Sequence, residues 1–184
     1  MALRYSARLV RLAILSDIHA NLPAMEAVLA DIDDAGIEAL WCLGDVVGYG
    51  AQPDECTRLV AERCELCLVG NHDLAVLGEL DDSSFSPAAA AAVRWTRETA
   101  RPETIDFLRG LKPADESREG RWLLNPGSVG QPRDGDPRAA WLELDTDAWE
   151  ATYHRIDYEI DRAADAIVAS ELPEHLAKRL YVGQ

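Results

Sequence analysis

Residues 12–19 read Leu-Ala-Ile-Leu-Ser-Asp-Ile-His, a short apolar run that stops abruptly at an acid and a histidine. Continuous apolar runs of this length are typical of strands buried on both faces of a sheet. Two later stretches, 38–45 (EALWCLGD) and 64–73 (CELCLVGNHD), repeat the pattern, and helical stretches at 24–36 and 54–63 separate them. The order strand, helix, strand, helix, strand predicts an α/β fold around a parallel sheet with right-handed crossovers.

The second half of the chain follows a different pattern. A proline opens each of two expected helices, at 87–100 and at 102–110. Residues 121–125 (RWLLN) have the composition of a strand, and 139–158 are expected to form an antiparallel hairpin. A C-terminal helix is expected from about Glu159. This half therefore adds helices and a hairpin rather than further strand-helix units.

Length and charge limit the class of protein. A chain of 184 residues fits one domain, taken as 1–184, and 48% apolar with 28% charged residues indicates a globular protein. The 33 acidic against 18 basic residues give a net charge of -15, which argues against non-specific nucleic-acid binding and against anionic membranes as partners. No apolar stretch is long enough to span a bilayer, and the four cysteines are interpreted as buried free thiols. We therefore expect a cytoplasmic protein.

Each of the three predicted parallel strands ends in residues of metal-binding or catalytic type: Asp17 and His19, then Asp45, then Asn71, His72 and Asp73. The carboxyl ends of neighbouring parallel strands meet at one crevice, so these side chains are expected to share one site. Carboxylate, imidazole and amide ligands suit manganese, iron or zinc. The two oxygens of one carboxylate can bridge ions about 3.5 to 4 Å apart, the spacing of two-metal hydrolytic sites. The sequence thus predicts a divalent metal site.

Four stretches of the chain carry a family resemblance. LSDIHAN (15–21), LGDVVGYG (43–50) and VGNHD (69–73) resemble, in this order, the first three motifs of the calcineurin-like metallophosphoesterase superfamily, above all of its small bacterial single-domain phosphodiesterase branch. NPGSVGQPRDGDPRA (125–139) resembles the stretch that follows the last metal motif in that branch. The resemblance implies a layered α-β-β-α sandwich and a metal-dependent enzyme that hydrolyses phosphate esters, with phosphodiesters as the expected class.

The resemblance also implies a set of metal ligands. Asp17 and His19 would bind a first ion, and Asp45 would bridge it to a second ion held by Asn71. Manganese is the expected metal, with iron, nickel or zinc as alternatives. A metal-bound hydroxide would attack the ester, and the ions would neutralise charge that develops on the phosphoryl oxygens.

Three more residues receive a role from the same resemblance. His72 would lie near the scissile phosphate as a general acid or a transition-state stabiliser, and Asp73 would orient its ring. Arg133 is interpreted either as a phosphate contact or as a solvated loop arginine. The expected partner of this site is a phosphate-ester substrate.

The chain departs from the family pattern in its histidines. The family continues with a histidine after a fourth strand and a Gly-His-x-His after a fifth, but this chain has four histidines in all and no Gly-His pair. His154 is interpreted as a packing or solvent-exposed residue, and His175 is expected in the C-terminal helix. Several dozen residues, with two central strands, are therefore expected to be missing near 113–120. The first ion would keep three protein ligands and the second two, so one or two ions are expected.

Three explanations of the missing segment stay open. The sequence is an in-frame deletion or a faulty gene model of an ordinary enzyme, a real but impaired family member, or a chain whose sheet a second chain completes, as in a homo-oligomer. Removing two strands would leave unpaired edges and exposed apolar faces. Two alternative functions are therefore considered. The chain is either a phosphoesterase or a catalytically impaired family member that binds metal, nucleotide or protein.

Overall fold

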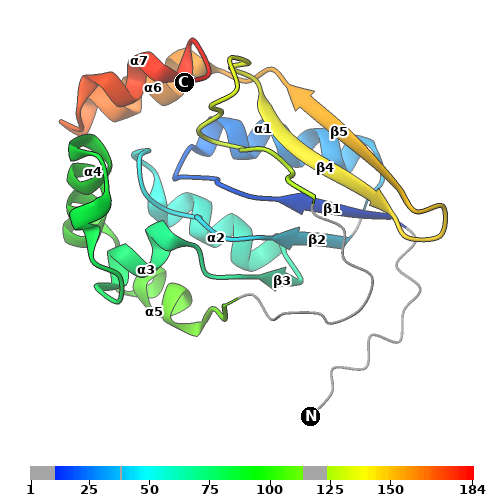
Figure 1. The fold of residues 1–184 in the computed structure, drawn as a ribbon, viewed down its shortest axis with the longest axis horizontal. Coiled ribbons are helices and arrows are strands. Elements are labelled where there is room, and N and C mark those ends of the chain that lie inside the picture. Colours follow the sequence, from blue (N-terminus) through cyan, green and yellow to red (C-terminus); the bar gives the residue numbers. More distant parts are fainter. Residues whose placement is uncertain (1–10, 38, 114–123) are drawn as a thin grey trace.

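The computed structural model describes residues 11–37, 39–113 and 124–184. Figure 1 shows a sheet with helices around it. The first half contains β1 (Arg11–Leu15), α1 (Leu22–Asp34), β2 (Ala39–Cys42), α2 (Pro53–Arg63), β3 (Leu66–Cys67) and α3 (Asn71–Leu77). The second half contains the short 3₁₀ helix η1 (Asp82–Ser84), α4 (Pro87–Thr99), α5 (Pro102–Gly110), β4 (Ala139–Asp145), β5 (Glu150–Ile156), α6 (Ile160–Ala169) and α7 (Glu174–Leu180).

The five strands form one sheet in the order β3-β2-β1-β4-β5. β1, β2 and β3 are parallel, as predicted, with Leu12 opposite Ala39 and Cys42 opposite Cys67. β4 runs antiparallel to β1 and forms the expected hairpin with β5. The mixed α/β class is confirmed. Among the described residues the strands belong to this single sheet, and no second β layer of the expected sandwich packs on it.

Helix α1 covers the sheet with the apolar stripe that its sequence predicts. Met25, Val28 and Ile32 are fully buried and belong to the main core with residues of β1 and β2. The side chain of Asn21 accepts a hydrogen bond from the amide of Ala24 at 3.2 Å, which caps the helix. Because the cap fixes where the helix begins, it also fixes the loop between β1 and α1.

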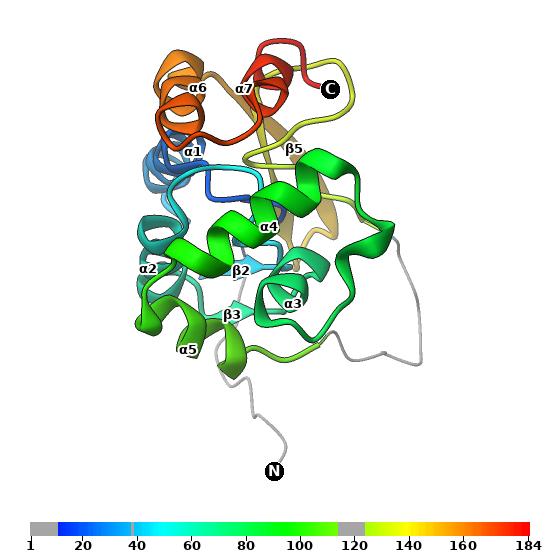
Figure 2. The ribbon, with the colours of Figure 1, turned by 90° about the vertical axis from the view of Figure 1, so that its left-hand side faces the viewer.

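The C-terminal helices lie beside the loops that follow the parallel strands. β1, β2 and β3 point toward the side of the molecule on which α4 and α7 stand (Figures 1 and 2). Helices α6 and α7 pack against each other, and α6 also packs against α1. A second core cluster joins Leu176 and Leu180 of α7 to Ala92 of α4 and to Tyr49. This cluster brings the end of the chain to the strand-end loops.

Two elements differ from the expectation because of local turns. β3 has only two residues, since the chain turns at Gly70 into α3, a helix that was not predicted. Asp73 accepts a hydrogen bond from the Gly70 amide and so starts the helix, and Gly78 ends it at φ 77°. The expected C-terminal helix is broken into α6 and α7, with Glu171 at φ 56° between them. Of the expected strand 121–125, residues 121–123 lie outside the described residues and the other two are not in a strand.

The open edge of β3 is partly paired. Leu68 forms a parallel bridge with Lys112, and the amide of Val69 donates to the Lys112 carbonyl at 3.0 Å. On one face of the sheet Leu12, Ile14 and Leu142 are buried in a small third cluster. A missing segment was expected to leave a strand edge and a sheet face exposed. In the structure Lys112 pairs with part of the β3 edge, and apolar side chains are buried on the sheet face. Of that predicted position, 113–120, residues 114–120 lie outside the described residues.

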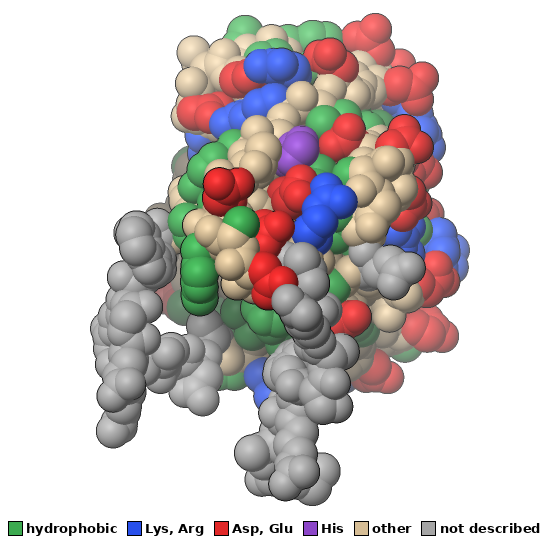
Figure 3. Space-filling view, turned by 90° about the vertical axis from the view of Figure 1, so that its right-hand side faces the viewer, with side chains coloured by type: hydrophobic (Ala, Val, Ile, Leu, Met, Phe, Trp, Pro, Cys, Tyr) green, Lys and Arg blue, Asp and Glu red, His purple; other side chains and the backbone are tan. Residues whose placement is uncertain are grey.

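The surface agrees with the acidic composition. Figure 3 shows acidic side chains spread over the face at the β4–β5 end of the molecule. None of the helices in the described part of the chain is both long and apolar enough to cross a membrane.

Candidate metal centre

Three of the predicted ligands meet at the ends of β1 and β2. Each of Asp17, His19 and Asp45 offers one ligand atom, and these atoms lie within 4.8 Å of one another. All three residues have positive φ, at 54°, 51° and 53°, a conformation that costs free energy in residues other than glycine. Hydrogen bonds between the two loops hold it: the Asp17 amide donates to the Gly44 carbonyl at 3.1 Å, and the His19 amide to the Asp45 carbonyl at 2.9 Å.

The ring of His19 is oriented as a metal ligand would be. The ring is 1% exposed, and its Nδ1 lies 3.2 Å from the Val47 carbonyl oxygen. With the proton on Nδ1, the ring donates to Val47 and Nε2 carries a lone pair. Nε2 lies 3.4 Å from Oδ1 of Asp17 and has no hydrogen-bond partner, although it is buried. A buried acceptor nitrogen facing a carboxylate fits a divalent cation between them.

The two carboxylates differ in their surroundings. Burial raises the pKa of Asp17, but the nearby His19 ring, the Ser16 hydroxyl and the charge of Arg133 together outweigh it, so the pKa lies below its ordinary value. Burial raises the pKa of Asp45 above its ordinary value, although His19 and the amide of His72 oppose the shift. That amide donates to Oδ1 of Asp45 at 2.8 Å. Two carboxylates beside an imidazole form an oxygen and nitrogen donor set suited to first-row divalent ions.

His72 and Asn71 begin helix α3 at the same site. Asn71 is exposed and lines the pocket that Asp17, His19 and Asp45 also line. The His72 ring is 4% exposed and packs against the rings of His19, Tyr49 and Phe85 at centroid distances of 4.8, 4.5 and 4.8 Å. Burial, together with the proximity of His19 and Arg133, lowers the pKa of His72 to about 3. The ring is therefore a neutral imidazole at physiological pH.

Asp73 accepts hydrogen bonds from two backbone amides, and none of its described hydrogen bonds goes to the His72 ring. Its Oδ1 accepts from the Val47 amide at 3.1 Å and its Oδ2 from the Gly70 amide at 2.9 Å. Because α3 begins at Asn71, His72 and Asp73 are successive helical residues, and successive side chains of a helix do not face each other. Burial raises the pKa of Asp73 to about 6, against the effect of the two amides. Asp73 instead ties the loop after β2 to the loop after β3.

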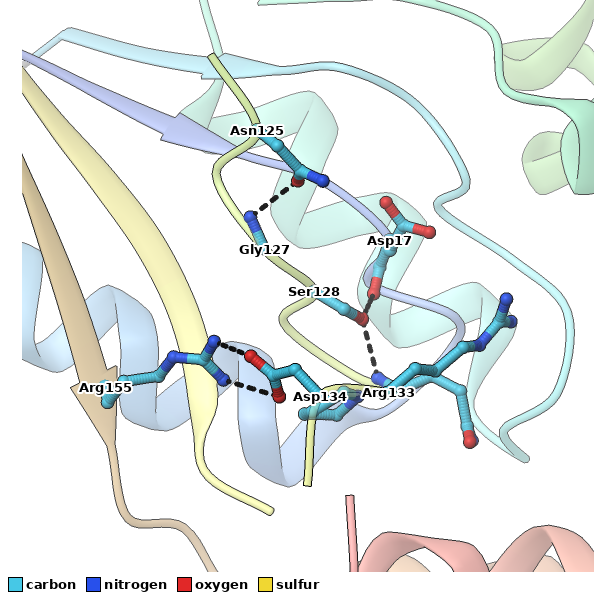
Figure 4. Close-up of a pocket in the computed structure, with 9 residues that line it drawn as sticks. Asp17, Asn125, Gly127, Ser128, Arg133, Asp134 and Arg155 are labelled. Atoms are coloured by element: carbon cyan, nitrogen blue, oxygen red, sulfur yellow. Dashed lines mark hydrogen bonds and ion pairs between the residues drawn. The ribbon is translucent and has the colours of Figure 1, made fainter. Parts of the chain in front are cut away.

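The segment 125–138 holds the Asp17 loop in place. The Ser128 hydroxyl and the Gly130 amide both donate to the carbonyl oxygen of Asp17, each at 2.9 Å. Figure 4 shows Arg133 pointing away from the ion pair that Asp134 forms with Arg155. Arg133 lines the same pocket as the ligands, and its Cζ lies 5.3 Å from the centre of the Tyr49 ring.

The pocket contains residues that the sequence did not point to. It has a volume of about 460 Å³. Besides the predicted residues it is lined by Tyr49, Phe85, Ser86, Ala89, His175 and Arg179. His175 and Arg179 are four residues apart on α7, a spacing that places them on one helix face, but nothing in the sequence connects that face to the strand ends.

His154 lies away from this pocket and packs as expected. Its ring stacks on Trp141 with a centroid distance of 4.0 Å and an interplanar angle of 7°. Its Nε2 lies 3.3 Å from Glu143. The interpretation of His154 as a packing residue is therefore confirmed.

Several known proteins are similar to this chain in sequence, and solved structures are similar to it in fold. The chain is 32% identical to protein MJ0912 of Methanocaldococcus jannaschii over 94% of this chain and 98% of that protein. It is 31% identical to the phosphodiesterase YfcE of Escherichia coli over 76% of this chain and 89% of the relative. A crystal structure of a metallophosphoesterase from Sphaerobacter thermophilus matches with a TM-score of 0.80 at 31% identity, over 96% of this chain and all of that one.

The alignment with MJ0912 contains a gap in this chain. It spans 238 positions, and 238 minus the 184 residues of the chain leaves 54, so at least 54 positions have no counterpart here. The position of the gap near 113–120 stays a prediction. The model of the calcineurin-like phosphoesterase family matches residues 10–162. With this match and these relatives, the chain belongs to the calcineurin-like phosphoesterase family.

Proposed function

We propose that this chain is a metal-dependent phosphoesterase that hydrolyses phosphate esters, with phosphodiesters as its substrate class. The observation that carries the proposal is the unpaired, buried Nε2 of His19, which faces Asp17 within a cluster completed by Asp45. A buried ring nitrogen without a partner calls for an explanation, and a cation that takes its lone pair supplies one. The similarity to an Escherichia coli protein named as a phosphodiesterase supports the substrate class.

The ligand set favours one ion, with manganese as the expected metal and iron, nickel or zinc as alternatives. Three protein ligands with positions left open can hold a single ion, as the triads of mononuclear iron enzymes do. When bound, such an ion lowers the pKa of a coordinated water and neutralises charge on the phosphoryl group. Asn71 lines the same pocket and is the expected ligand of a second ion.

The other residues of the pocket act on the substrate. His72 stays neutral because its pKa is about 3, so it keeps one N–H through the pH range of a cell and can donate it to a phosphoryl or leaving-group oxygen. Asp73 acts as a positioning residue, since its carboxylate accepts the Val47 and Gly70 amides that flank the site. Arg133 faces the pocket with a permanent positive charge suited to an anionic ester.

The second candidate function is a metal-binding module without turnover. The absence of the two histidine motifs from the sequence favours it, because the second ion would lose most of its ligands. A ligand that binds only the native state raises its stability. This candidate therefore predicts a rise of the melting temperature with manganese and no release of product.

Hydrolysis of bis(p-nitrophenyl) phosphate by the full chain tests the proposal. We expect nitrophenol release that depends on manganese, iron, nickel or zinc and that is lost in Asp45→Asn. The matched control is Asp106→Asn, a change at an exposed aspartate whose only described ion pair is with Arg109 on the surface of α5. Product release no faster than in the protein-free reaction with all four metals rejects catalysis, and equal activity of Asp45→Asn and wild type rejects this site.

A further inference from the structure

Two arginines line the same pocket wall, and neither forms an ion pair with a described aspartate or glutamate side chain. Of the described arginines, Arg11, Arg58, Arg63, Arg94, Arg101, Arg109, Arg138, Arg155 and Arg162 pair with an acidic side chain. Arg97 donates to two backbone carbonyls. Arg133 and Arg179 form no ion pair with a described aspartate or glutamate side chain, although the chain has 33 acidic residues. The Nε of Arg179 donates to the backbone oxygen of Gln184, and its guanidinium group also interacts with the Tyr49 hydroxyl.

The same aromatic ring positions both guanidinium groups. The Cζ atoms of Arg133 and Arg179 lie 5.3 and 5.7 Å from the centre of the Tyr49 ring. The Tyr49 ring in turn lies 4.7 Å from the ring of His19 and 4.5 Å from that of His72. Tyr49 is 7% exposed, so it serves as a fixed spacer. Both guanidinium groups therefore lie beside the ring that packs against His19 and His72, and they line the same pocket.

The helix that carries Arg179 is held rigidly at this wall. Leu176, Ala177 and Leu180 of α7 are buried in the cluster that contains Tyr49. His175 lines the pocket one helical turn before Arg179, so both face it from the same side of α7. Burial and the charge of Arg133 lower the pKa of Arg179, which agrees with two cations close together. Like charges held this close repel each other until an anion lies between them.

Once a metal ion is bound, the carboxylates of the pocket do not serve as the anion between the two arginines. Asp17 and Asp45 are the pocket's carboxylates, and a divalent ion would take their negative charge. The arginines then need a different anion. The scissile phosphate is the anion expected at the metal ligands, so the anion at the arginines is a second group of the same substrate.

We propose that Arg133 and Arg179, with His175 beside them, form an anion-binding subsite, and that the preferred substrates are phosphate esters that carry a second phosphate group. The inference rests on the proposed phosphoesterase function, because it specifies the substrate of that same site. The planar guanidinium forks bind phosphate oxygens in pairs, and the Tyr49 ring orients them.

Equilibrium binding tests the subsite without requiring turnover. The full chain, saturated with manganese, is titrated calorimetrically with thymidine 3′,5′-bisphosphate and with thymidine 5′-monophosphate, which differ by one phosphate. We expect the bisphosphate to bind roughly tenfold more tightly, as one additional charge-assisted contact provides. Arg179→Gln and Arg133→Gln should each reduce the ratio to less than about threefold, and salt should weaken it.

Lys178→Gln is the matched control. Lys178 is the neighbour of Arg179 on α7, but it is 74% exposed and pairs with Glu174 at 2.8 Å. This variant removes the same charge from the same helix and should keep the tenfold ratio. Equal affinities of the two ligands for the wild type overturn the inference, and so does an unchanged ratio in both arginine variants. Failure of the hydrolysis test with a retained tenfold ratio rejects the phosphoesterase function and leaves the subsite standing.

Discussion

Gly70 is a position at which a single methyl group should disturb the metal ligand Asp45 directly. Its φ of -95° and ψ of 174° suit alanine, so backbone strain has no part in the effect. A Cβ at this position would lie well within 3.0 Å of the amide nitrogen and Oδ1 of Asp45, a distance that real Cβ atoms essentially never show. Gly70→Ala therefore forces the Asp45 loop or its carboxylate to move.

The size of the effect follows from this overlap. Forcing a methyl group into a packed site costs about 1–3 kcal/mol of the free energy of unfolding. In a chain of this length, 1 kcal/mol shifts the melting temperature by about 2–4 °C, so Gly70→Ala should melt roughly 2–12 °C lower than wild type. A displaced ligand weakens metal binding on the order of 10–100-fold. Thermal unfolding of the metal-free protein and a manganese titration measure the two effects.

Gly110→Ala is the control for this substitution. A Cβ at Gly110, the last residue of α5, would meet no atom within 4 Å. Alanine in a helix is more stable than glycine by roughly 0.5–1 kcal/mol, so this variant should melt at or slightly above the wild-type temperature. It should also bind manganese as the wild type does. If Gly70→Ala matches the wild type in both measurements, the close packing of Gly70 on Asp45 is refuted.

Three further substitutions probe single contacts. His19→Gln should weaken manganese binding by at least the 10–100-fold typical of disturbed ligand shells, and unchanged affinity would remove His19 from the ligand set. Since the pKa of Asp73 is about 6 in the fold, against an ordinary 3.8, its contribution to stability is complete below pH 3.8 and is lost as the pH rises through 6. The metal-free wild type should thus lose about 1 kcal/mol between pH 5 and 7 relative to Asp73→Asn, and parallel stability curves in urea would contradict this. His154→Ala should lower the melting temperature by roughly 1–6 °C through loss of its stack on Trp141, while metal stoichiometry stays the same; a lower stoichiometry would make His154 a ligand.

Local pattern was sufficient to predict the elements that hold the centre. The apolar runs before Asp17 and Asp45 gave β1 and β2, and the rule for parallel strand ends placed the two acids and His19 at one crevice. The buried apolar stripe of α1 could be predicted because its residues recur with the helical period. These features depend on neighbours within a few residues, which is the range that a sequence pattern expresses.

The remaining features depend on turns and tertiary contacts that no local sequence pattern predicts. Asp73 follows His72 directly, but the turn at Gly70 places both in a helix and sends their side chains in different directions. An acid three residues after Gly70, whose carboxylate accepts the Gly70 amide, was the available signal for that helix. Arg179 lies far along the chain from Asp45 and reaches the pocket only because α7 packs on Tyr49 and α4. No local periodicity predicts such a contact.

Metal content of the purified full chain, measured after manganese loading and removal of free ions, tests most directly whether Asp17, His19 and Asp45 hold the catalytic ion. We predict one tightly bound ion per wild-type chain and none in Asp45→Asn, because only three acidic and imidazole ligands converge in the described structure. Two tightly bound ions per wild-type chain, or one retained in Asp45→Asn, would contradict a single-ion centre built on these residues.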